Sequence, residues 1–304
     1  MQRFTLTRRD GAPLAGYLAG STGPVLLLAN GLGGPVSAFR HQIARFEPRY
    51  RVLTWDYRGL YASRGEMPPR RVDVAAHAED LEDLLREVTT SPAILVGWSM
   101  GVQVTLELAR RAPGLVRELV LINGAQGRPM TNGRVPLAEH WLPALIERLR
   151  PHHALGSRLF ARAARSRRGA ELARRLHLVS PRLATHELLE LVGEFKDLDF
   201  DVYLRTLAAL EQHDATPGLA QLDARTLVIA GGRDPLFSRR LAGKLTRQLR
   251  HGELYVVPRA THYAPLEFPE LVNARIEQFL AGRPDAPEEA PESARRAPID
   301  RAAG

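Results

Sequence analysis

The chain has 304 residues, of which 44% are apolar, and a formal net charge of +8. This apolar content can bury a substantial core, which excludes wholesale disorder, and no apolar run approaches the roughly 18–20 residues of a membrane-spanning helix. Because the chain contains no cysteine, disulfides, thiolate metal sites and a cysteine nucleophile are excluded. The N-terminus lacks the apolar stretch of a secretory signal, so we expect a cytoplasmic protein.

The positive charge comes almost entirely from arginine, which is concentrated between Arg148 and Arg182. These arginines alternate with leucine and phenylalanine, a pattern typical of the solvent-exposed faces of amphipathic helices. A basic surface that attracts anionic lipid or substrate is the alternative interpretation. We expect no nucleic-acid partner and no integral membrane segment.

Strands and helices alternate through both ends of the chain. Two short strands, 3–9 and 14–19, are expected to form a hairpin across Asp10 and Gly11, a pair suited to a tight turn. Buried strands are predicted over 24–29, 50–55, 92–96, 115–122, 226–230 and 253–257. Apolar residues at helical spacing predict helices over 37–46, 72–88, 102–111, 239–249 and 269–280. Such alternation is typical of an α/β fold, a mostly parallel sheet flanked by helices.

The alternation stops after Asn123, and residues 126–219 show helical patterns without a convincing strand. We interpret 126–219 as a helical cap insertion over the carboxyl edge of the sheet, where ligands bind in such folds. Residues 1–125 and 220–281 then form the core domain. The tail, 282–304, combines proline and mixed charge with few large apolar residues, so it is predicted to be disordered.

The segment with the clearest chemistry is Gly97-Trp98-Ser99-Met100-Gly101, which lies between a buried strand and a helix. This is a G-x-S-x-G nucleophile elbow, in which the serine stands on a sharp turn and side chains at Gly97 or Gly101 would collide with that turn. The turn also places Ser99 at a helix N-terminus, whose free N–H groups favour a developing oxyanion. We predict that Ser99 is a nucleophile; the alternative is a structural turn.

Such a serine needs a base and an acid, which follow it along the chain in the order acid, histidine. Of ten histidines, only His262 follows the last predicted strand, where a loop can carry it over the sheet edge. Asp234 follows the preceding strand and could hold the imidazole in the required tautomer, although an Asp-Pro turn is the alternative. At the rival position after strand 115–122 stands Asn123, which cannot carry the charge, and Asp56 precedes the serine.

The loop over residues 30–34, Asn-Gly-Leu-Gly-Gly, follows the first buried strand. Its glycines, beginning with Gly31, let the backbone approach a substrate closely. We predict that the N–H groups of Leu32 and Met100 form an oxyanion hole. A phosphate-binding loop is the alternative, but no lysine follows and G-x-G-x-x-G is absent.

From position alone, we expect Trp98 and the cap residue Trp141 to bind substrate. Other apolar residues are expected to complete this acyl pocket: Leu32, Met100, Leu142, Leu145 and Phe160. The alternative for the cap residues is that they form the core of the cap, because side chains at helical spacing often pack within their own domain.

Together these motifs resemble the α/β-hydrolase superfamily, and in particular its capped serine-hydrolase branch of esterases, lipase-like enzymes and proteins called hydrolase or acyltransferase. The motifs that carry the resemblance are residues 30–34, 56–59, 97–101 and 231–234, and Thr261-His262 with Glu267 and Pro269. The resemblance implies an eight-stranded sheet with one antiparallel strand, a Ser99–His262–Asp234 triad, no metal and no cofactor. The sequence departs from the family at Asn30, where histidine is common, and at Tyr61, which replaces a glycine.

The predicted activity is therefore hydrolysis of a carboxylic ester through an acyl-enzyme, with a small-molecule ester or acyl substrate as the partner. Two other reactions remain open on the same triad, acyl transfer to an acceptor other than water and cleavage of a carbon–carbon bond. A non-catalytic ligand-binding protein on the same fold is the alternative from another class. The sequence does not indicate an oligomeric state.

Overall fold

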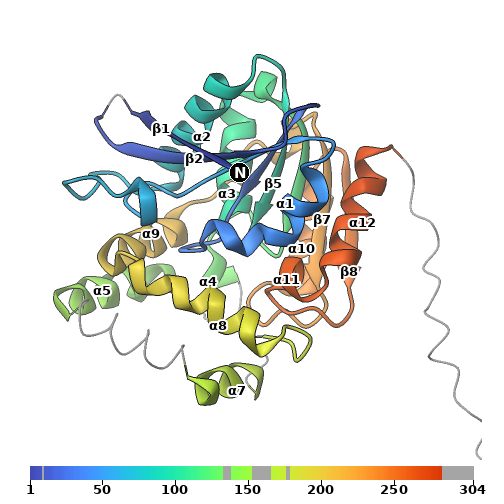
Figure 1. Cartoon of the computed structure of the whole chain (residues 1–304). Helices are drawn as coiled ribbons and strands as arrows, with labels where there is room; N and C mark the ends of the chain where they lie inside the picture. The colour runs from blue at the N-terminus through green and yellow to red at the C-terminus, as the bar shows by residue number, and fades with distance from the viewer. Residues whose placement is uncertain (9, 133–137, 153–165, 176–178, 283–304) are drawn as a thin grey trace, which may run out of the picture.

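A computed structural model describes residues 1–8, 10–132, 138–152, 166–175 and 179–282. Its centre is a single eight-stranded sheet (Figure 1). The strands are β1 (Gln2–Thr7), β2 (Pro13–Ala19), β3 (Val25–Ala29), β4 (Arg51–Trp55), β5 (Ala93–Trp98), β6 (Val116–Ile122), β7 (Arg225–Gly231) and β8 (Gly252–Val257). All eight strands were predicted, and each begins and ends within two residues of its expected range.

The strands lie in the order β1-β2-β4-β3-β5-β6-β7-β8. Strand β2 pairs antiparallel with both β1 and β4. The remaining pairs, in the order β4-β3-β5-β6-β7-β8, are all parallel. The sheet thus has one antiparallel strand, as the resemblance implied. Because β3 to β8 are parallel, the loops after their carboxyl ends meet at one edge of the sheet.

Helices cover both faces of the sheet, so its central strands are apolar on both sides. Along β3, Leu27 packs into the core that contains helices α2 (Val74–Val88), α3 (Met100–Arg111) and α10 (Arg239–Gln248). Its neighbours Leu26 and Leu28 pack into the other core, against α1 (Arg40–Phe46) and α12 (Pro269–Leu280). This alternation follows from the two-residue period of a strand, and it confirms the predicted three-layer α/β fold.

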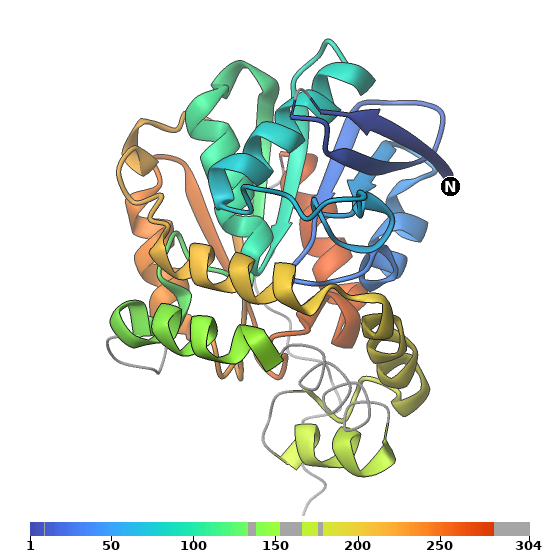
Figure 2. The same cartoon turned by 90° about the vertical axis from the view of Figure 1, so that its left-hand side faces the viewer.

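The regular elements that the structure describes between β6 and β7 are helices, apart from one isolated bridge between Gly127 and Asp214. The helices of this segment are α4 (Pro129–Asn132), α5 (Ala138–Leu149), α7 (Arg167–Arg175), α8 (Thr185–Glu194) and α9 (Phe200–Gln212). Figure 2 shows α5 and α9 crossing one end of the sheet. We call residues 126–219 the insertion. Two earlier expectations, a pocket role for Phe160 and a disordered tail beyond Gly282, fall outside the described residues.

Some of the helices begin at a residue whose side chain caps them. Asp73 accepts the N–H of Ala76 at the start of α2, at 2.8 Å, and Asp199 does the same for Val202 at the start of α9, at 3.0 Å. Such caps satisfy N–H groups that have no partner inside a helix. None of the helices in the described ranges is long and apolar enough to cross a membrane.

Candidate active site

The turn between β5 and α3 holds Ser99 in a backbone conformation that residues other than glycine rarely adopt, with φ 57° and ψ −114°. The two flanking glycines make this turn possible. A Cβ added to Gly97 would lie 2.5 Å from the carbonyl oxygen of Gly101, and one added to Gly101 would lie 2.1 Å from that of Ala29. Ser99 therefore stands on a strained turn at the carboxyl edge of the sheet, the position that a nucleophile elbow requires.

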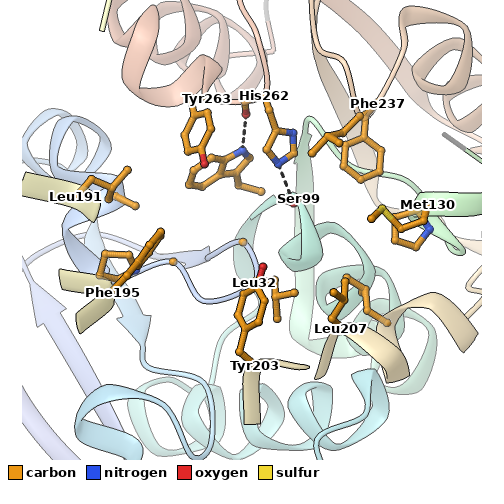
Figure 3. Close-up of a pocket in the computed structure, with 18 residues that line it drawn as sticks. Leu32, Ser99, Met130, Leu191, Phe195, Tyr203, Leu207, Phe237, His262 and Tyr263 are labelled. Atoms are coloured by element: carbon orange, nitrogen blue, oxygen red, sulfur yellow. Dashed lines mark hydrogen bonds between the residues drawn. The ribbon is translucent and has the colours of Figure 1, made fainter. Parts of the chain in front are cut away.

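Three side chains from three loops meet at this edge. The Nε2 atom of His262 lies 3.0 Å from the Oγ of Ser99, and its Nδ1 atom lies 3.0 Å from the Oδ2 of Asp234. The side chain of Asp234 is fully buried and that of His262 is 11% exposed. The structure thus brings together the three residues that were selected from the sequence. Figure 3 shows two of them, Ser99 and His262, joined by their hydrogen bond. Serine, imidazole and carboxylate in this order can transfer a proton away from the serine hydroxyl.

Backbone contacts hold the carboxylate in place. The Oδ1 atom of Asp234 accepts the N–H groups of Leu236 at 2.7 Å and Phe237 at 3.0 Å. This leaves Oδ2 directed at the imidazole, and the ring of Phe237 stacks on that of His262 with centroids 5.4 Å apart. The loop after β7 therefore fixes the orientation of both the carboxylate and the imidazole.

Asn123 links the two loops that carry the acid and the histidine. Its side-chain oxygen accepts the N–H of Gly231 at 2.9 Å, and its amide nitrogen donates to the carbonyl of Thr261 at 2.6 Å. The sequence excluded Asn123 as the acid because it has no charge. The structure gives it a different task, since a buried amide can donate to one loop and accept from the other.

Glu267 anchors the histidine loop from the other side. Its carboxylate accepts the N–H of Thr261 at 2.7 Å, the hydroxyl of Thr261 at 2.5 Å and the N–H of Ser180 at 2.6 Å. Burial raises the pKa of the Glu267 carboxyl, while these hydrogen bonds act in the opposite direction. Because Ser180 belongs to the insertion, Glu267 connects the insertion directly to the residue that precedes His262.

The loop over residues 30–34 lies next to the serine, since a Cβ on Gly31 would be 3.2 Å from the Cβ of Ser99. The side chain of Asn30 organises this loop from within, accepting the N–H of Gly31 at 3.0 Å and donating to the carbonyl of Pro35 at 2.6 Å. In the described part of the chain, no hydrogen bond uses the N–H of Leu32. Met100 begins α3, where an N–H also has no partner inside the helix.

Tyr61, which stands where the family has glycine, contacts this same loop. Its backbone has φ 45°, in the left-handed region that favours glycine, and its hydroxyl donates to the carbonyl of Gly33 at 2.6 Å. Tyr57 donates to the carbonyl of Asn30 at 2.8 Å. Two tyrosines from the loop after β4 thus hold both ends of the 30–34 loop. The sequence marked Tyr61 as a departure but did not indicate this contact.

A cavity of about 260 Å³ opens beside Ser99. Its lining in the described structure combines the sheet-edge loops with the insertion: Gly31, Leu32, Gly34, Pro35, Ala38, Trp98, Ser99, Pro129, Met130, Leu191, Phe195, Tyr203, Leu207, Leu210, Leu236, Phe237, His262 and Tyr263. Figure 3 shows Leu191, Phe195 and Tyr203 facing the serine from the insertion side. The site is thus closed by residues far apart in the sequence.

The predicted pocket residues divide into two groups. Trp98 and Leu32 line the cavity, and Trp98 also donates from Nε1 to the carbonyl of His262 at 2.9 Å. Trp141 is 43% exposed and is not among the described residues that line the cavity, so its role in binding substrate stays a prediction. Leu142 lies on the face of α5 that packs against α9. This residue therefore fits the alternative interpretation, in which side chains at helical spacing form a core within the insertion.

Two other titratable residues, Asp56 and His213, have structural partners of their own. Asp56 accepts the hydroxyl of Tyr17 at 2.8 Å and the N–H of Ala62 at 3.1 Å, away from the serine. His213 contacts the side chain of Gln103 at 2.6 Å. Within the described ranges, no three His, Asp or Glu side chains gather in a way that could hold a metal ion.

The comparison with known families agrees with this architecture. A family model described as alpha/beta hydrolase fold matches residues 24–269. That range is most of the chain, so the protein belongs to the α/β-hydrolase family. The eight-stranded sheet and the turn after β5 are the features that this membership leads one to expect.

Individual relatives are hydrolases. The chain is 26% identical over 262 residues to a putative carbamate hydrolase RutD of Agrobacterium fabrum, covering 84% of this chain and 93% of the relative. It is 26% identical to 3-oxoadipate enol-lactonase 2 of Acinetobacter baylyi, covering 91% and 96%. A crystal structure of a hydrolase from Pseudomonas aeruginosa aligns with a TM-score of 0.73 at 25% identity, covering 91% of this chain and 98% of that one. The protein is therefore a hydrolase of the α/β fold.

Proposed function

We propose that the protein is a serine hydrolase that cleaves a carboxylic ester through an acyl-enzyme. The observation that supports this most directly is the pair of 3.0 Å contacts that connects Ser99 to His262 and His262 to Asp234 beside an apolar cavity. A structural serine turn needs neither a buried carboxylate on the far side of the imidazole nor an adjoining cavity.

In the proposed mechanism, Nε2 of His262 takes the proton of Ser99 as Oγ bonds to the ester carbonyl carbon. Asp234 accepts the Nδ1–H of His262, which holds the required tautomer and stabilises the imidazolium. The tetrahedral intermediate then collapses, the bond to the alcohol oxygen breaks, and the imidazolium gives its proton to that oxygen. In the second half, His262 takes a proton from water as the water oxygen attacks the acyl-enzyme carbonyl. The imidazolium then returns a proton to Oγ of Ser99 as the bond between Oγ and the acyl carbon breaks and the acid leaves.

The N–H groups of Leu32 and Met100 would stabilise the oxyanion in both tetrahedral intermediates. Two observations support this role: no described residue accepts the N–H of Leu32, and Met100 stands at the start of a helix. Such donors stabilise the transition state more than the ground-state ester and typically contribute about 100–1000-fold in rate. We further propose that the insertion serves as a cap, which supplies the cavity wall that faces the serine.

The names of the relatives indicate which other reactions should be tested. Carbamate hydrolase and enol-lactonase both denote attack on a carbonyl carbon, which the same serine could perform. Acyl transfer to another acceptor and cleavage of a carbon–carbon bond also begin with this attack. Identifying the products from ester, lactone, carbamate and diketone substrates, with and without an added acyl acceptor, separates these reactions, because the set of products differs from one reaction to the next.

The first experiment asks whether the serine is reactive. We expect a fluorophosphonate probe to label the wild-type protein at Ser99 and p-nitrophenyl esters to be hydrolysed. Replacement of Ser99 by alanine should abolish labelling and lower kcat by several orders of magnitude. A matched control is Ser91→Ala, since Ser91 is an exposed serine outside the cavity.

Two outcomes would contradict the proposal. One is near-wild-type ester hydrolysis by the Ser99→Ala protein. The other is a wild-type protein that neither takes the label nor turns over any member of the panel, which would favour the non-catalytic ligand-binding alternative.

A further inference from the structure

The cavity beside Ser99 is apolar and uncharged. Among the described residues that line it, the only titratable groups are the His262 ring and the hydroxyls of Tyr203 and Tyr263; no aspartate, glutamate, lysine or arginine is present. This is unexpected in a chain of which 25% is charged. The side chains that a bound substrate would meet are mainly leucine, phenylalanine, proline and methionine.

Two carboxylates that neighbour cavity-lining residues in the sequence are bound elsewhere and do not line the cavity. Glu211 follows Leu210, which lines the cavity, yet its carboxylate is fully buried and accepts the N–H of Met130 at 2.8 Å. Glu194 precedes Phe195, and its carboxylate accepts the hydroxyl of Ser37 instead of facing the serine. At these two positions the insertion directs an apolar side chain into the cavity and uses the adjacent carboxylate to hold a backbone N–H or a hydroxyl.

Two tyrosine hydroxyls are the exception to the apolar lining. Figure 3 shows the hydroxyl ends of Tyr203, from α9, and Tyr263, which follows the histidine, directed into the space around Ser99. Neither hydroxyl makes a hydrogen bond to any other residue that the structure describes. A hydroxyl inside an apolar cavity without a partner is costly, so each can gain by donating to a ligand.

Both rings are held in position by aromatic neighbours. Tyr203 stacks on Phe200 with centroids 5.7 Å apart and planes at 7°, and Tyr263 meets Trp98 edge-on at 5.6 Å. Burial raises the pKa of Tyr203, and it raises that of Tyr263 to about 12. The hydroxyls are thus neutral and oriented near neutral pH, as hydrogen-bond donors to a substrate need to be.

The physical consequence is selection by charge. A carboxylate brought into this cavity would lose hydration and would find no cation among the described lining residues, which disfavours its binding. A neutral carbonyl or ether oxygen would lose less hydration and could accept from a tyrosine hydroxyl. The volume of about 260 Å³ lies below the ~300–1,000 Å³ of pockets for drug-sized ligands, which indicates a small substrate.

We propose that the natural substrate is a small uncharged ester with a second, neutral oxygen acceptor, and that the Tyr203 hydroxyl binds that acceptor. This inference rests on the proposed serine-hydrolase function and goes beyond it by naming the substrate class. Tyr203 acts here as a specificity residue, since it would contact the substrate away from the reacting carbonyl. Tyr263 provides the second donor on the opposite wall.

Three esters of equal acyl-chain length test the charge selection. They are p-nitrophenyl hexanoate, the mono-p-nitrophenyl ester of adipic acid, and the p-nitrophenyl methyl diester of adipic acid. The second carries a terminal carboxylate, and the third replaces it by a larger but neutral methyl ester. We expect kcat/KM for the carboxylate to be about 100-fold or more below that for hexanoate, and that for the diester to equal or exceed it. Rates are normalised to alkaline hydrolysis and to sites titrated with the fluorophosphonate.

The Tyr203→Phe protein tests the hydroxyl. It should lower the ratio of kcat/KM for the diester to that for hexanoate about fivefold, chiefly through a higher KM for the diester. Tyr50→Phe is the matched control, because Tyr50 packs against Phe46 outside the cavity. It should not alter the ratio of diester to hexanoate.

The possible results separate the two proposals. Carboxylate hydrolysis as efficient as that of hexanoate would overturn the charge selection, and an unchanged diester-to-hexanoate ratio in Tyr203→Phe would overturn the role of Tyr203. In both cases the fluorophosphonate label would still mark a working hydrolase. Absence of label together with absence of turnover on all three esters would overturn the hydrolase proposal and this inference with it.

Discussion

The two sides of the cavity are built in different ways. On the sheet side, Ser99, Asp234 and His262 stand on short loops after parallel strands and are held by buried hydrogen bonds at 2.6–3.2 Å to neighbouring backbone. On the insertion side, the cavity is walled by side chains of α4, α8, α9 and the turn between α8 and α9, which offer apolar surface and one hydroxyl. The sheet side orders reactive groups, and the insertion shapes the space before them.

This difference assigns separate tasks to the two regions. Reactive groups need positions accurate to a fraction of an ångström, which strands and their short loops supply. Selection among substrates needs shape and polarity, which a helical segment can change without disturbing the sheet. We therefore expect changes on the sheet side to lower kcat for every substrate and changes on the insertion side to alter the relative rates of different substrates.

The largest effect should come from Asp234→Asn. The amide would donate to Nδ1 of His262 and so place the ring proton on Nε2, where it prevents the ring from accepting the serine proton. We expect kcat to fall by about 10³–10⁴-fold with every ester and the order of substrate preference to stay the same. Asp56→Asn, another strand-end aspartate, is the control and should lower kcat less than about tenfold. Equal losses of kcat in the two variants would contradict the assignment of Asp234 as the acid of the triad.

Glu267 lies where the two regions meet, and its replacement sharpens the comparison. In Glu267→Gln, the amide nitrogen would face one of the donors from Thr261 or Ser180, so at least one hydrogen bond to a charged acceptor is lost. We expect kcat to fall roughly tenfold, the melting temperature to fall, and the preference among acyl chains to change as well. Glu277→Gln, on α12 in an ion pair with the exposed Arg45, should leave all three unchanged.

If Glu267→Gln lowered kcat while the acyl-chain preference stayed constant, the insertion would be independent of the histidine loop. The contact from Ser180 would then be structural only. A series of p-nitrophenyl esters from acetate to octanoate measures this preference directly.

The smallest effect is expected on the sheet side from Tyr61→Phe. Losing the hydroxyl removes one hydrogen bond to Gly33 and so loosens the loop that presents the N–H of Leu32. We expect kcat to fall about fivefold for all esters, with KM nearly constant, since one neutral hydrogen bond contributes about 1 kcal/mol. A change confined to particular acyl chains would instead place Tyr61 among the residues that select substrate.

Much of the molecule followed from local patterns. The strands were predicted because runs such as residues 25–29 are apolar on both faces, and Ser99 because its turn demands glycine on each side. Asp234 and His262 were selected by their places after the last two strands, since parallel strands bring such loops to one edge. These predictions depend on steric and periodic rules that act over a few residues.

The rest was decided by tertiary structure. Trp141 and Tyr203 both lie on amphipathic helices of the insertion, yet only Tyr203 faces the cavity. Helical spacing shows that a face is buried but not which neighbour buries it, because that depends on how the helices cross. The contacts of Tyr61 with Gly33 and of Glu267 with Ser180 join residues 28 and 87 positions apart. Such pairings arise only when the folded sheet and insertion pack together, so they leave no local pattern in the sequence.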